Sequence, residues 1–122
     1  MPKSWLFYHF IWSTKYRQPL IDEKNREIII KSIVAKSAEL GAAVLAINGV
    51  DDHMHLLVSV SPTVSPSVLI GQVKGVSSHL VRRLGWKDFK WQTEYAVKAV
   101  PESKLPVVIR YIKNQQAHHA KR

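Results

Sequence analysis

The sequence of 122 residues contains no cysteine, which excludes disulfide bonds and thiolate metal sites. It has no apolar run long enough to cross a membrane, and its first residues, Met-Pro-Lys-Ser-Trp, lack the apolar stretch of a signal peptide. Internal repeats and low-complexity segments are also missing. These absences predict one domain over residues 1–122 that folds without cross-links, acts in the cytoplasm and has no membrane partner.

Acidic residues are scarce, since nine Asp and Glu stand against eighteen Lys and Arg, for a formal net charge of +9 and a pI near 10.0. Such an excess in a small domain favours a polyanionic partner, most often nucleic acid. The alternative is a basic soluble protein without that partner. A membrane-surface role is disfavoured because the cations are spread along the chain. Charge therefore indicates a class of partner but no reaction.

Apolar periodicity predicts an alternation of strands and helices. We expect strands over 5–13, 42–50, 53–60 and 91–100, and helices over 23–40, 66–84 and about 104–118. Asp22, Ser65 and Ser103 are the expected N-caps, and Gly41 is expected to end the first helix. The order β-α-β-β-α-β with an appended helix is the ferredoxin-like split arrangement of the α+β class, with an antiparallel sheet and two helices on one face. The other face is left for a ligand, a partner chain or the appended helix.

Two glycines interrupt the second expected helix. Gly71 and Gly75 are one turn apart, and each costs helix stability of roughly 1 kcal/mol relative to alanine. Close approach of another backbone or of a ligand would explain them, and poor optimisation of the helix is the alternative.

The stretch around which the chain is organised is His53-Met54-His55, at the start of an expected strand. Side chains alternate along a strand, so the two histidines share one face and Met54 lies on the other. Imidazole is the commonest metal ligand, and two imidazoles side by side on a rigid element are a candidate metal-binding pair. By itself the pair is weak support, because His-x-His also occurs by chance.

A second group of polar residues lies on the last expected helix. Tyr111 and Gln115 are four residues apart, so they share one helix face. Taken alone, this pattern favours a surface tyrosine that packs on the sheet.

Taken together, five blocks in order resemble the single-tyrosine HUH transposases of insertion sequences and their relatives, the REP-associated tyrosine transposases. The blocks are His9 with residues 12–17, residues 52–58, residues 74–80, residues 91–96, and Tyr111 to Gln115. One departure is Glu94, which stands where many members have glycine.

The resemblance implies a DNA transposase that cleaves and rejoins single-stranded DNA through a covalent 5′-phosphotyrosine intermediate and recognises hairpins at the ends of a mobile element. Tyr111 would be the nucleophile, and His53, His55 and Gln115 would hold a divalent metal, Mg²⁺ or Mn²⁺. It further implies a homodimer, often with the tyrosine helix of one subunit completing the histidine site of the other.

Cations that could hold DNA phosphates occur in several segments. They are Lys15, Arg17, Lys74, Arg82 and Arg83, with Lys87 and Lys90 beside Trp86 and Trp91 as further candidates. Two other functions remain open. One is a domesticated REP-associated nickase with the same chemistry, and the other is a non-catalytic ferredoxin-like module that binds nucleic acid by aromatic stacking.

Overall fold

The structure, a computed structural model, describes residues 5–115. Its strands are β1 (Leu6–Ser13), β2 (Ala42–Gly49), β3 (His53–Val60) and β4 (Ala96–Ala99). Its helices are α1 (Glu23–Glu39), α2 (Pro66–Arg83) and α3 (Leu105–Lys113), with short turns η1 (Lys15–Arg17) and η2 (Glu102–Lys104). Within the described part of the chain, no helix is long and apolar enough to cross a membrane.

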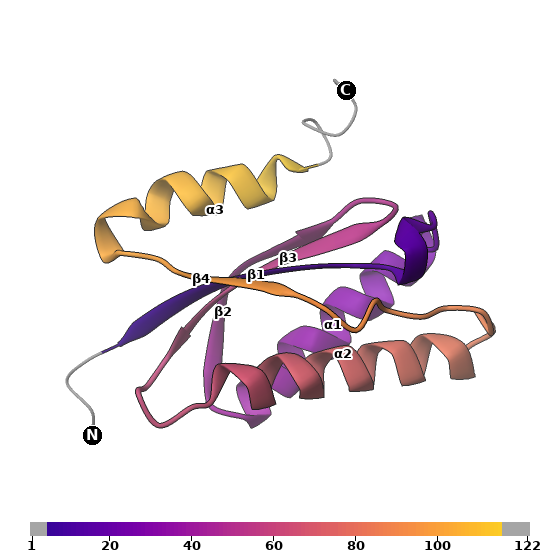
Figure 1. Ribbon diagram of the computed structural model, residues 1–122, viewed down its shortest axis with the longest axis horizontal. Coiled ribbons are helices and arrows are strands. Elements are labelled where there is room, and N and C mark those ends of the chain that lie inside the picture. The colour runs from indigo at the N-terminus through magenta and orange to yellow at the C-terminus, as the bar shows by residue number, and fades with distance from the viewer. Residues whose placement is uncertain (1–4, 116–122) are drawn as a thin grey trace.

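The four strands form one antiparallel sheet in the order β2-β3-β1-β4. Helices α1 and α2 lie together on one face of this sheet, and α3 lies over the opposite face (Figure 1). The predicted α+β class, the antiparallel sheet and the appended helix are therefore confirmed.

The boundaries of the first two helices follow from local chemistry. The side chain of Asp22 accepts from the backbone N–H of Asn25, and the Asn25 side chain accepts from the backbone N–H of Asp22, which together make a capping box. The Ser65 hydroxyl accepts from the N–H of Val68 ahead of α2. Gly41 has a φ of 83°, a left-handed conformation that suits glycine after a helix end.

The fourth strand is shorter than the predicted 91–100. Trp91 makes one isolated bridge to Thr14, and regular pairing begins only at Ala96. Between these residues, the Lys74 ammonium donates to the carbonyls of Gln92 and Thr93, at 2.6 and 3.0 Å. The segment is therefore held by a side chain from α2. The apolar pattern that predicts a strand over 91–100 contains no sign of this contact.

The start of the last helix also differs from the prediction. Ser103 lies within η2, and α3 begins after Lys104 without a side-chain cap. Pro106 in the first turn has no backbone N–H, so the start of α3 has one donor fewer that a capping side chain would have to satisfy. The part of the expected helix beyond Gln115 lies outside the described residues.

The main core lies between the sheet and the pair α1–α2. The even-numbered residues of β1 and β3 point into it, and Phe10, Met54 and Leu56 are completely buried there. Full burial of side chains of this size contributes about 1.5–3 kcal/mol each. The odd-numbered residues of the same strands face α3, where Leu57 and Ile112 form a smaller apolar cluster. The fold thus presents two faces of β3, one apolar and one that carries the histidines.

Candidate active site

The histidines of β3 lie on the sheet face that α3 covers. Their ring centroids are 5.1 Å apart with the planes at 69°, and His53 and His55 are only 6% and 3% exposed. Met54 between them is in the main core. The predicted alternation of these three side chains is therefore confirmed.

Each histidine is oriented by a second group. The Asp52 carboxylate lies 2.7 Å from Nδ1 of His53, and Nε2 of His9 lies 2.9 Å from Nδ1 of His55. Metal-binding histidines typically use one ring nitrogen in this way, which fixes the ring and directs the other nitrogen to the ion. In the sequence, His9 stands out only as part of the first block of the resemblance, and the structure brings it to His55, 46 residues away along the chain. The feature of the sequence that could have predicted this contact is the odd-numbered position of His9 in β1, which puts His9 on the same sheet face as His55.

The environment of His9 favours its neutral form. Burial lowers the pKa of His9, and the positive charge of Lys98, its register partner on β4, lowers it further. A neutral His9 can donate from one nitrogen and accept at the other, so it can hold His55 without adding a positive charge beside it.

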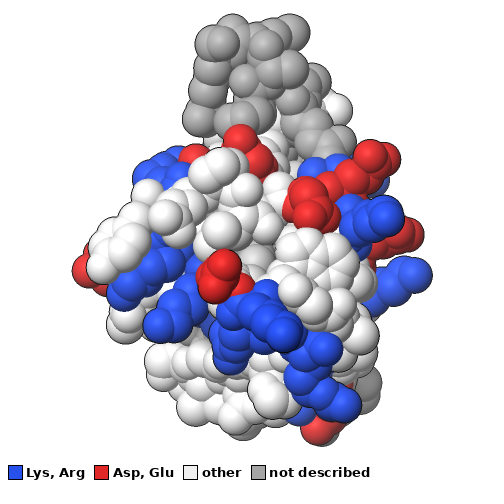
Figure 2. Space-filling model, turned by 90° about the vertical axis from the view of Figure 1, so that its right-hand side faces the viewer, with Lys and Arg blue, Asp and Glu red and all other residues white. Residues whose placement is uncertain are grey.

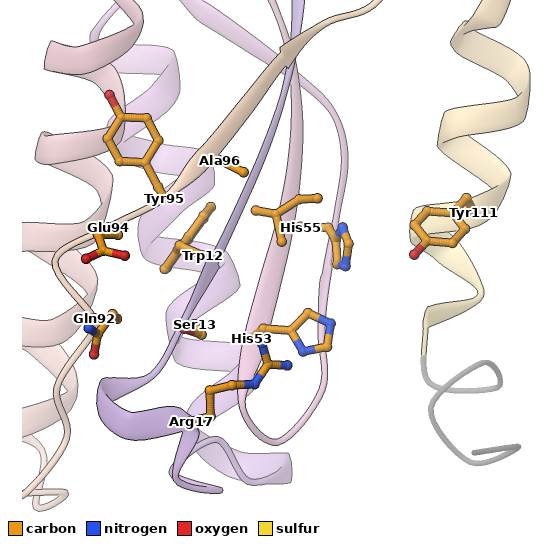
Figure 3. Close-up of a pocket in the computed structure, with 11 residues that line it drawn as sticks. Trp12, Ser13, Arg17, His53, His55, Gln92, Glu94, Tyr95, Ala96 and Tyr111 are labelled. Atoms are coloured by element: carbon orange, nitrogen blue, oxygen red, sulfur yellow. The ribbon is translucent and has the colours of Figure 1, made fainter.

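Tyr111 reaches this site from α3. Its ring stands edge-on to His55, with centroids 5.6 Å apart and planes at 83°. Figure 3 shows the tyrosine on α3 facing the histidines of β3. The side chain is 43% exposed, so it can be reached from outside. This contact is made within one chain, because α3 folds back over its own β2 and β3.

Gln115 follows Tyr111 by one helical turn and is 1% exposed. Its Nε2 is buried and makes no hydrogen bond to any described residue. The end of its helix is held by Asn48 of β2, whose amide donates to the carbonyls of Ile112 and Lys113, at 3.1 and 3.2 Å. Asn48 is the register partner of His55, so the last turn of α3 is fixed beside the histidine strand. Sequence reasoning did not single out Asn48, and nothing in its local pattern marks it.

Two neighbouring imidazoles have a chemistry that suits a divalent metal, whereas Gln115 is not among the residues that line the cavity around them. Among residues 5–115, no group of three or more His, Cys, Asp or Glu side chains gathers for an ion. An amide oxygen is another type of ligand that divalent metals accept.

The histidines, Tyr111 and Arg17 line one cavity of about 440 Å³ (Figure 3). Arg17 stands at its edge, with Nε 3.6 Å from the carboxylate of Asp52. The segment before β4 forms the opposite wall with Glu94 and Tyr95. Glu94, the residue that departs from the resemblance, thus places a carboxylate at the site.

The predicted DNA-binding cations fall into separate places. Arg17 lines the active-site cavity, and Lys15 lies 5.2 Å from the ring centroid of Tyr16. Lys74 and Arg82 line a groove beside α2, and Arg83 is exposed in its last turn. Figure 2 shows the end of the molecule where α2 finishes, with Lys and Arg side chains across the middle and lower part and Asp and Glu between them.

Two solved structures share this fold. A crystal structure of a candidate transposase from Deinococcus radiodurans R1 matches with a TM-score of 0.75 and 24% identity, covering 92% of both chains. A REP-associated tyrosine transposase bound to a REP hairpin matches with a TM-score of 0.74 and 16% identity, covering 93% of this chain and 68% of that one. At these identities the two matches support the fold.

Sequence similarity extends further. The chain is 30% identical to the ISDra2 transposase TnpA of Deinococcus radiodurans over 121 residues, which cover 90% of this chain and 84% of the relative. It is 32% identical to the transposase for insertion sequence element IS200 of Salmonella typhimurium, over 88% of this chain and 75% of the relative. The sequence model of the family described as "Transposase IS200 like" matches residues 3–115. The chain therefore belongs to the IS200-like transposase family.

Proposed function

We propose that this transposase cleaves and rejoins single-stranded DNA through a covalent 5′-phosphotyrosine intermediate on Tyr111. The observation that carries the proposal is the contact of Tyr111 with His55, at 5.6 Å between ring centroids, in a cavity that also contains His53. A tyrosine that only packed on the sheet would be expected to lie against apolar side chains. Here it lies against a histidine pair whose orientation is set by Asp52 and His9.

In the proposed reaction, the phenolic oxygen of Tyr111 attacks the scissile phosphorus. The new bond joins that oxygen to phosphorus, and the bond from phosphorus to the 3′ oxygen breaks. The phenol loses its proton and the departing 3′ oxygen gains one, so protons balance. The phosphodiester is conserved as a phosphotyrosine ester. A 3′-OH from another strand end can therefore reverse the step without ATP, which gives strand transfer as well as cleavage.

The residues that would hold a divalent metal are His53, His55 and Gln115. A bound ion would withdraw charge from a non-bridging oxygen of the phosphate. Nitrogen ligands suit Mn²⁺ better than Mg²⁺, so use of Mg²⁺ in cells would reflect its abundance. Two imidazoles and one amide leave positions for phosphate and water, as a catalytic site requires.

Residues of the chain itself would also position the substrate. Arg17 at the edge of the cavity is exposed and can bind a phosphate next to the scissile one. The Asp52 carboxylate would keep Nδ1 of His53 as a donor, so that the opposite nitrogen, Nε2, faces the ion.

The proposed substrate is a single strand with hairpins at the ends of a mobile element. Support comes from the net charge of +9 and from the structural similarity to a transposase that was solved with a REP hairpin. Lys15, Lys74, Arg82 and Arg83 are the further cations proposed to contact it. We expect the protein to act in the cytoplasm, where the DNA lies in bacteria such as those that carry the relatives.

We also propose a homodimer with composite sites. In the single chain, α3 buries Ile112 against Leu57 of its own sheet. The short segment 100–104 joins β4 to α3, and the same helix face could instead pack on the sheet of a second copy. Each site would then combine the histidines of one chain with Tyr111 and Gln115 of the other.

The test is formation of a covalent adduct. Wild-type protein is incubated with labelled single-stranded DNA from the flanks of its own gene, with Mg²⁺ or Mn²⁺, and separated under denaturing conditions. We expect an adduct in the wild type and in Tyr16→Phe, an exposed tyrosine used as control, and none in Tyr111→Phe, which still binds the DNA. An undiminished adduct in Tyr111→Phe would overturn the assignment.

A further inference from the structure

A second hollow, of about 380 Å³, lies between α2 and the segment 90–95. We name it the α2 groove. Its walls are built from Ile70, Ser78 and Trp91, and its charged lining residues are Lys74, Arg82 and Lys90. It is a separate hollow from the active-site cavity, but the two share Gln92 and Tyr95.

Gly71 and Gly75 line the α2 groove, and we call the surface that they present its floor. A Cβ added at either position would have no heavy atom of the described residues within 4 Å, helix neighbours excepted. No other backbone in the described part of the chain approaches these glycines, so packing does not explain them. Alanine would be the better helix former at both positions. What the glycines do provide is open space at the floor of the groove, where a side chain would otherwise stand.

The charge of the α2 groove is of one sign. Its three charged lining residues are cations, and no acidic side chain of the described residues lines it. The Lys74 ammonium holds the carbonyls of Gln92 and Thr93, which stiffens one wall. Lys90 is exposed and Arg82 uses one nitrogen on the carbonyl of Phe89, so other donors of both side chains remain for an anion.

Tyr95 stands on the boundary between the two hollows. Its side chain is 39% exposed, and its ring centroid lies 6.3 Å from that of the buried Phe10. Figure 3 shows its hydroxyl directed away from the histidines. The two hollows therefore adjoin at Gln92 and Tyr95.

We infer that the α2 groove holds one unpaired nucleobase of the strand that is cleaved at Tyr111, flat on the floor formed by Gly71 and Gly75, with its phosphate at Lys90 and Arg82. This inference rests on the proposed function and adds where the strand runs beyond the scissile phosphate. A base offers a flat apolar face with an anion beside it, which matches an open apolar floor flanked by cations. Stacking of single bases on aromatic side chains, here Tyr95, tolerates any sequence.

The test fills the floor of the groove. Gly75→Leu and Gly71→Leu place an isobutyl group in the hollow, and leucine is a strong helix former, so folding is retained and is checked by thermal melting. The matched control is Gln72→Leu, at an exposed position of the same helix that does not line the groove. The probe is a fluorescein-labelled single-stranded oligonucleotide from the gene's flank, in which each base in turn is replaced by an abasic site.

We expect one position at which loss of the base weakens binding to wild type by about 5- to 150-fold, the range for one stacked base. Gly75→Leu should bind the intact probe more weakly by a similar factor and should not respond to that abasic site. Gln72→Leu should behave as wild type. Tyr95→Ala, which removes the ring, should lose affinity.

If Gly71→Leu and Gly75→Leu bind the intact probe as tightly as wild type, or keep the same abasic profile, the α2 groove is not a base site. The two proposals remain distinguishable, because a Tyr111-linked adduct in those experiments would leave the nuclease assignment in place. A wild-type protein that binds no single-stranded probe overturns both.

Discussion

Nε2 of His9 lies 2.9 Å from Nδ1 of His55, across the neighbouring strands β1 and β3. The two residues are not direct register partners, since His9 pairs with Leu57 and His55 with Ile11. They are diagonal neighbours on the same face of the sheet. Long or aromatic side chains can bridge the distance between such neighbours. Through this bond, a residue of the first strand sets the ring orientation of a proposed metal ligand on the third.

Replacement of His9 should therefore weaken metal binding. Loss of a partner that orients a metal ligand typically costs 10- to 100-fold in affinity or activity. We expect His9→Ala to bind Mn²⁺ more weakly by about that factor in calorimetry, while circular dichroism shows a retained fold. His79→Ala, at an exposed position of α2, is the control. Equal Mn²⁺ affinity in His9→Ala and wild type would reduce His9 to a packing role.

Removal of either histidine of β3 should abolish metal-dependent cleavage. His53→Ala and His55→Ala each leave one imidazole, and both side chains point away from the main core, so the fold should be retained. A chelator added to wild type should have the same effect on cleavage, reversed by Mn²⁺. The measurement is calorimetry with Mn²⁺ together with the adduct assay. If the two mutants bind Mn²⁺ as tightly as wild type does, the histidines are structural residues and not metal ligands.

The same Gly-to-Ala change should have opposite effects at two positions. A Cβ at Gly49 would lie against Sδ of Met54 and 3.1 Å from the carbonyl oxygen of His53. Crowding of this kind costs about 1–3 kcal/mol, so Gly49→Ala should lower the free energy of unfolding. Gly75→Ala meets open space in a helix and should raise it by about 0.5–1 kcal/mol. Urea denaturation measures both, and a stabilised Gly49→Ala would contradict the close approach.

Asn48→Ala should loosen the end of α3. The change removes the donor to the carbonyls of Ile112 and Lys113, and each such bond contributes about 0.5–1.5 kcal/mol. We expect a loss of about 1–2 kcal/mol of unfolding free energy and a slower adduct reaction, with DNA binding unchanged. Asn114→Ala removes an exposed amide from the same helix end and should change neither. A normal adduct rate in Asn48→Ala would show that this anchor does not position Tyr111.

Composite sites can be tested by mixing inactive variants. His55→Ala and Tyr111→Phe proteins are combined, their subunits are allowed to exchange, and cleavage is assayed. In a dimer with exchanged α3 helices, one site of the mixed pair has intact histidines and an intact tyrosine, so about half of the wild-type activity should return to each mixed dimer. If every site forms within one chain, as the contact in the single chain allows, both sites stay broken. A monomer in solution would also exclude exchange.

Local patterns of the sequence determined much of this protein. The alternation through His53, Met54 and His55 was sufficient to place two imidazoles on one face, because successive side chains of a strand point to opposite faces of the sheet. Caps at Asp22 and Ser65 set the starts of α1 and α2, because a short polar side chain satisfies its own neighbouring N–H groups. These features depend on residues within a few positions of one another.

Only the tertiary structure decided the features that join distant segments. The bond between His9 and His55, the anchor from Asn48 to α3, and the hold of Lys74 on the segment before β4 each need a particular register or helix placement. The last of these interrupts the predicted strand over 91–100. Such contacts depend on how strands and helices pack in three dimensions, and side-chain bonds between residues far apart along the chain leave no periodic pattern in the sequence.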